Sequence, residues 1–171
     1  MASIIEVLMD VIEEEIQVHE ALLETAVKKT SIIIKGNLTE LSQITEIEQI
    51  QVEQLSSLER KREESMYDIC MVLGKKPGTV KFPELIELME SQPEVKGRLQ
   101  EEYKRLKNIV YELKDRNEHN RSLINDSLEM AEFSINLLQN TQIVPDTANY
   151  NKGAYNVEPS GTDRALFDTK S

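Results

Sequence analysis

The stretch PEVKGRLQEEYKRLKNIVYELKDRNEHNRSLINDSLEMAEFSINLL, residues 93–138, repeats apolar or small residues at alternating steps of four and three. The repeated positions are Leu99, Tyr103, Leu106, Val110, Leu113, Asn117, Asn120, Ile124, Ser127 or Leu128, Ala131, Ile135 and Leu138. Such a heptad pattern predicts one long helix over residues 93–139, roughly 65–70 Å long. The other segments are expected to cover its apolar stripe, which only the amides of Asn117 and Asn120 interrupt.

Two earlier segments, residues 3–34 and 38–73, also show amphipathic helical patterns. Between them, Gly36 is suited to end the first helix. Asn37, with Glu40 three residues later, is suited to begin the second helix as a variant of the capping box. Because only two residues join the two helices, we expect them to fold back as an antiparallel hairpin.

A break at residues 74–78 (GKKPG) ends the second helix, and Pro83 suits the first turn of a short helix over residues 83–90. The predicted fold class is therefore all-α: an elongated antiparallel bundle of three long helices, with the short helix inserted before the last. This bundle is expected to occupy residues 1–140. Residues 141–171 hold Pro, Gly and many polar residues without a period, which predicts a flexible tail, disordered or conditionally folded.

The net charge and the cysteine content limit the classes of partner and the cellular compartment that the sequence predicts. The net charge of −11 argues against nucleic acid or an anionic membrane surface as the partner. The one cysteine, Cys70, has no internal partner, which favours a reducing compartment. No apolar run reaches the ~18–20 residues of a membrane span, and the first residues lack the basic start of a signal peptide. We expect a soluble, cytoplasmic protein.

The residues offer little for catalysis or metal binding. Di-iron bundles need Glu-x-x-His twice, but Ile16 precedes His19 by three positions and Arg116 precedes His119. Cys70 and two isolated histidines do not build a zinc site either. Glu13, Glu14 and Glu15 point in different directions on a helix and fit a solvated face. The sequence therefore predicts no enzyme, no metal and no cofactor.

Binding of another protein remains as the predicted activity. A long bundle offers grooves for helical ligands, although most stripe residues must form its core. Asn117 and Asn120 either set the register of the helices or hydrogen-bond a neighbouring turn. The main alternative is a structural coiled-coil protein that self-assembles through the same stripes, and a second alternative is a metal-bearing bundle enzyme.

The run Asn117-Glu-His-Asn120-Arg-Ser-Leu123-Ile124 resembles a signature late in the last helix of the FlgN family of flagellar export chaperones. Leu128 and the pair Leu137-Leu138 follow at similar positions. The order of elements is also similar: a long helix, a Gly-Asn turn, a Leu-rich helix, a short Pro-led helix, a long helix and a tail. Tyr150-Asn151-Lys152-Gly153 resembles a stretch in the tails of some members.

The resemblance implies a function without catalysis. Family members bind helical terminal segments of the hook-associated (hook–filament junction) proteins in the cytoplasm, prevent their premature assembly and deliver them to the export gate. We expect a monomer or small oligomer. The candidate partner-binding residues lie late in the long helix and in the tail: Ile124, Leu128, Ala131, Ile135, Leu138, Tyr150 and Tyr155.

Overall fold

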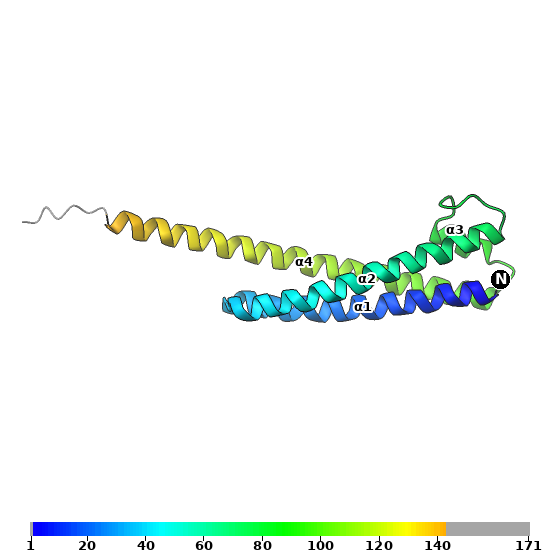
Figure 1. Cartoon of the computed structure of the whole chain (residues 1–171), viewed down its shortest axis with the longest axis horizontal. Coiled ribbons are helices and arrows are strands. Elements are labelled where there is room, and N and C mark those ends of the chain that lie inside the picture. The colour runs from blue at the N-terminus through cyan, green and yellow to red at the C-terminus, as the bar shows by residue number, and fades with distance from the viewer. Residues whose placement is uncertain (1, 143–171) are drawn as a thin grey trace, which may run out of the picture. The chain divides into compact units, whose positions relative to one another are not determined.

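The computed structural model describes residues 2–142, and these residues form four α-helices and no strand (Figure 1). The helices are α1 (Ala2–Lys35), α2 (Leu38–Val72), α3 (Phe82–Leu88) and α4 (Pro93–Gln142). The prediction of an all-α chain is confirmed for this part. The described residues as far as Glu132 form one compact unit, and the remainder of α4 from Phe133 belongs to a second. No helix in the described part is long and apolar enough to cross a membrane.

The turn between α1 and α2 forms as its residue types predict. Gly36 adopts a φ of 66°, the left-handed conformation that glycine reaches without steric cost. The main-chain N–H of Gly36 donates to the carbonyl oxygen of Ile33, at 3.0 Å. The Asn37 side chain then accepts from the N–H of Glu40, at 3.2 Å, and so caps α2. This tight turn brings α1 and α2 side by side (Figure 1).

Helix α1 holds most of the core. More than half of the buried apolar residues in the described part lie on α1, and only Leu99 lies on α4. The α1 residues are Ile5, Leu8, Met9, Val11, Ile12, Ile16, Val18, Leu22, Ala26 and Ile33. Since α2 and α4 both contact α1, apolar residues on several sides of α1 are buried.

The burial along α4 corrects the predicted heptad stripe. Leu99 is fully buried, but Val110 and Asn117 are exposed, and the half-buried positions include Ile109 and Arg116 instead. Every residue from 125 to 140 is exposed. The regular repeat suggested burial along the whole helix. In the structure Leu99 is the last buried apolar residue of α4 in the described part, Asn120 is buried through its polar side chain, and partial burial ends at Ile124. Most of the buried apolar residues of α1 lie in its first half, so the later part of α4 has less core to pack against.

The segment between α2 and α4 closes one end of the first unit. Val80, Leu85, Ile86 and Met89 join the same buried cluster as Leu99. The ring of Phe82, the first residue of α3, stacks on Tyr103 of α4 with 5.1 Å between the ring centres. The main-chain N–H of Lys81 donates to the Glu84 carboxylate, at 3.2 Å, and this bond begins α3. These contacts fix the start of α4 against the core.

Candidate partner-binding surface

The predicted partner-binding residues on α4 lie mostly on its surface. Ile124 is half-buried, Leu128 is 58% exposed, and Ala131 is exposed. In the second unit, Ile135 and Leu138 are also exposed. Tyr150 and Tyr155 lie outside the described residues.

Two large apolar residues that the sequence analysis did not name, Met130 and Phe133, are exposed as well, and so is Leu137, which it named only in the family resemblance. They stand outside the heptad repeat, which therefore does not indicate them. Only their residue type, large and apolar on a helix with an apolar stripe, could have indicated them.

In each of the two units, the exposed apolar residues of α4 lie on more than one side of the helix. An α-helix turns by about 100° per residue. In the first unit, Met130 therefore lies about 160° from Leu128 around the axis. In the second unit, Ile135 lies about 160° from Phe133. A helix that is apolar on several sides is normally covered on several sides.

The four family-motif residues have different environments. Asn117 is exposed, whereas Asn120 is only 3% exposed. The Asn120 amide nitrogen donates to the carbonyl oxygen of Ala26, at 2.8 Å, and its oxygen accepts from the Thr30 hydroxyl, at 2.6 Å. Leu123 and Ile124 are half-buried. The Asn120 bond reaches the main chain of a turn of α1, so it fits both predicted roles, whereas Asn117 is exposed and its predicted place in the buried stripe is wrong.

An ion pair between buried Glu15 and half-buried Arg62 links α1 and α2. The Arg62 Nε lies 2.9 and 3.0 Å from the two carboxylate oxygens of Glu15. Burial raises the pKa of Glu15 above its ordinary value, and the hydrogen bond and charge of Arg62 offset this only in part. His19, one turn later, is buried, and its Nδ1 lies 2.7 Å from the carbonyl oxygen of Glu15. Glu15 therefore lies in the core, which corrects its predicted place on a solvated face.

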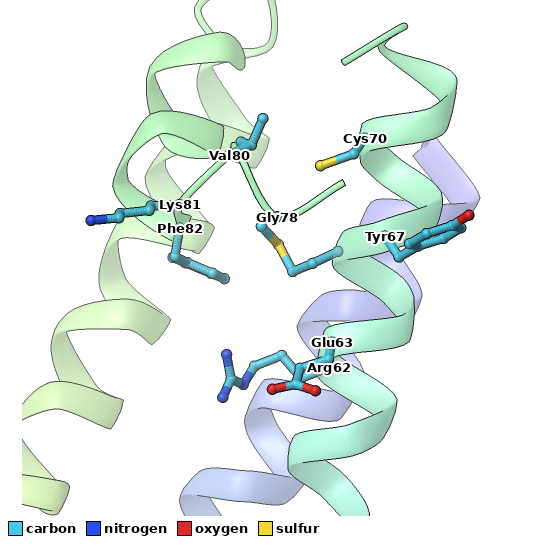
Figure 2. Close-up of a pocket in the computed structure, with 9 residues that line it drawn as sticks. Arg62, Glu63, Tyr67, Cys70, Gly78, Val80, Lys81 and Phe82 are labelled. Atoms are coloured by element: carbon cyan, nitrogen blue, oxygen red, sulfur yellow. The ribbon is translucent and has the colours of Figure 1, made fainter. Parts of the chain in front are cut away.

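A groove beside this ion pair runs between α2 and the segment that leads into α3 (Figure 2). Its volume is about 470 Å³, and its lining residues are Arg62, Glu63, Met66, Tyr67, Cys70, Gly78, Val80, Lys81 and Phe82. Figure 2 shows Arg62 and Phe82 extending toward this space from its two sides. The lining holds one carboxylate and no histidine, so it lacks the acid–base pairs typical of hydrolytic sites.

The described residues contain no group of three or more His, Cys, Asp or Glu side chains that could hold a metal ion. Among the exposed features of this part of the chain, the apolar residues of α4 are therefore the strongest candidates for a functional surface. They suit the binding of another protein.

A family model described as "FlgN protein" matches residues 1–156. No curated protein matches the chain, and no solved structure matches it. The matched range includes the motif residues 117–124 and the exposed apolar part of α4.

Proposed function

We propose that, in this chain, which belongs to the FlgN family of flagellar export chaperones, the late part of α4 binds the cargo. The cargo segments are the helical ends of hook–filament junction proteins. The observation that carries the proposal is the exposure of large apolar side chains after Ile124. Five of them are Leu128, Phe133, Ile135, Leu137 and Leu138. Exposed apolar clusters of this kind are typical of protein-binding surfaces.

The preferred partner is an amphipathic helix. The residues Ile124, Leu128, Ala131, Ile135 and Leu138 repeat at the four-three spacing that packs against another helix. Because apolar residues also lie on other sides of α4, one partner helix would leave some of them in water. The cargo therefore either wraps around α4 or supplies more than one helix.

This binding accounts for the action of a chaperone without catalysis. Terminal helices covered by α4 are unavailable for assembly into the filament junction, so the cargo stays unpolymerised in the cytoplasm. The tail residues Tyr150 and Tyr155 either close over the bound cargo or contact the export gate. We further infer that the three long helices form an antiparallel bundle in which α2 runs opposite to α1 and α4, and that the protein acts as a monomer or small oligomer.

The test of the cargo surface is calorimetric titration with purified hook–filament junction proteins of the same organism. The variant Leu128→Ser with Ile135→Ser removes two exposed apolar side chains. We expect it to weaken binding about 10–100-fold, while the melting temperature stays unchanged. The matched control is Ile50→Ser, which alters an exposed apolar side chain on α2. Equal affinity of the double variant and the unaltered chain would exclude this surface.

A second variant tests the tail. Deleting residues 145–171 should leave the unfolding of the helices nearly unchanged and weaken the binding of cargo or of the gate. Unfolding of the helices at a clearly lower temperature would instead make these residues part of the core.

Self-assembly through the same apolar surface is the competing function. Light scattering over a hundredfold range of concentration separates the two. A chaperone keeps the mass of a monomer or small oligomer, whereas an assembly protein grows with concentration.

A further inference from the structure

We propose that the turn between α1 and α2 provides a second contact for the cargo helix, through the two tip residues Ile34 and Leu38. This inference rests on the proposed function and extends its binding surface beyond α4. The three residues from which it is argued, Ile34, Leu38 and Leu128, all lie in the first unit, which ends at Glu132.

The register of α4 on α1 places the tip residues near the start of the exposed part of α4. Arg105 binds Glu13 across 92 sequence positions, at 2.8 Å, and Asn120 binds Ala26 across 94 positions. From the first pair to the second, the residue number rises on both helices by nearly the same amount. The two helices therefore run in the same direction with an almost constant offset. The same offset places Leu128 about level with the turn at Gly36.

Ile34 lies on the side of α1 that faces α4. Thr30, one turn earlier, donates its hydroxyl hydrogen to Asn120. Residues four positions apart lie on the same side of a helix, offset by only about 40°. Ile34 therefore follows Thr30 on that side, yet its side chain is 70% exposed.

The exposure of the tip residues has no explanation in the packing of the described chain. Leu38 is 78% exposed, the largest exposed fraction of any large apolar residue in this part. The conformation of the turn is fixed by Gly36 and Asn37, and it needs no apolar residue at position 34 or 38. Exposed apolar residues on both sides of a turn, level with Leu128, are explained by a partner that covers all three.

The chemistry of the partner follows from these positions. An amphipathic helix with apolar residues at steps of three and four can contact Leu128 on one side and the tip residues on another. The contact with α1 and α2 would also fix how far the cargo helix extends along α4. A polar or strongly charged segment would gain nothing from these three side chains.

The experiment compares three variants of the full chain by calorimetric titration with the purified hook–filament junction proteins. The tip variant is Ile34→Ser with Leu38→Ser, and the α4 variant is Leu128→Ser with Ile135→Ser. The control is Val7→Ser, which changes a half-exposed residue of α1 about 40 Å away along the helix. We expect the tip variant to bind about tenfold more weakly, and the control to bind as the unaltered chain does.

Hydrogen exchange gives a second measurement that needs no substitution. The amides of residues 32–40 should exchange more slowly when cargo is bound. An unchanged affinity of the tip variant together with unchanged exchange would overturn the inference, while a weakened α4 variant would leave the proposed function in place. Absence of binding by the unaltered chain would overturn both.

Discussion

The side-chain amide of Asn120 on α4 donates a hydrogen bond to the main-chain carbonyl oxygen of Ala26 on α1, at 2.8 Å. The bond joins two helices whose contacts are otherwise mostly apolar or exposed charge pairs. It lies one turn before α4 becomes fully exposed, and so it holds the last well-packed turn of α4 in register with α1.

Replacing Asn120 by alanine should destabilise the protein by about 1–3 kcal/mol, because its buried side chain loses its hydrogen bonds to the Ala26 carbonyl oxygen and the Thr30 hydroxyl. The matched control is Asn117→Ala, one turn earlier on the same helix but exposed. It should change the free energy of unfolding by less than about 0.5 kcal/mol. Urea denaturation measures both, and equal effects would contradict a special role for Asn120.

Truncations of leucine along α4 should have a graded effect. Leu99 is fully buried, so Leu99→Ala should cost about 2–5 kcal/mol. Leu113 is half-buried, and Leu113→Ala should cost about 1–2 kcal/mol, since part of its surface is already in water. Leu128→Ala should cost less than about 0.5 kcal/mol. A large loss at Leu128 would show that α4 is packed there, against the exposure that the structure shows.

Glu15 should make the stability depend on pH. Burial raises its pKa in the folded chain above the ordinary value of 4.5. Between 4.5 and the raised value, the folded state holds more protons than the unfolded state, so the free energy of unfolding falls as the pH rises. Above that range the ionised carboxylate, paired with Arg62, adds no further slope.

The variant Glu15→Gln isolates this effect, because Gln does not titrate. The difference in unfolding free energy, unaltered chain minus variant, should decrease from pH 4.5 upward and then become constant. Glu102, whose pKa burial also raises, contributes to both proteins and cancels. A difference that grows with pH would mean that the attraction of Arg62 outweighs the burial of Glu15.

Two glycine substitutions should have opposite signs. Gly36 has a φ of 66°, so Gly36→Ala should destabilise the turn by about 1 kcal/mol. Gly97 lies within α4, and a β-carbon there would meet no atom within 4 Å. Gly97→Ala should therefore stabilise the protein by about 0.5–1 kcal/mol. Thermal unfolding measures both, and a stabilising Gly36→Ala would contradict the left-handed conformation at position 36.

Local signals in the sequence predicted the helices and the turn well. Gly36 and Asn37 have conformations that few other residues adopt easily, so their positions indicated the end of one helix and the start of the next. The sequence indicated that Asn117 and Asn120 interrupt the apolar stripe, but it did not show which of them is buried. Both have the same residue type, and they lie only three positions apart. Only the direction in which each side chain points on α4 distinguishes them.

The centre of the core was not predicted correctly. The long heptad repeat in residues 93–138 drew attention to α4, whereas α1 holds most of the buried side chains. A clue was present in residues 4–12 (IIEVLMDVI), where apolar residues occupy more than one side of the helix. A regular repeat reveals a stripe, but it does not reveal how many neighbours cover that stripe.

The two-residue turn also implies an order of events in folding. Residues of α1 and α2 near the turn meet after a short loop closes, while the hydrogen bonds between the side chains of α4 and α1 join residues 90 to 94 positions apart. Short loops close at a smaller entropic cost, and contacts of low sequence separation generally form sooner. During synthesis from the N-terminus, the first two helices can therefore pair on the emerging chain before α4 has been translated.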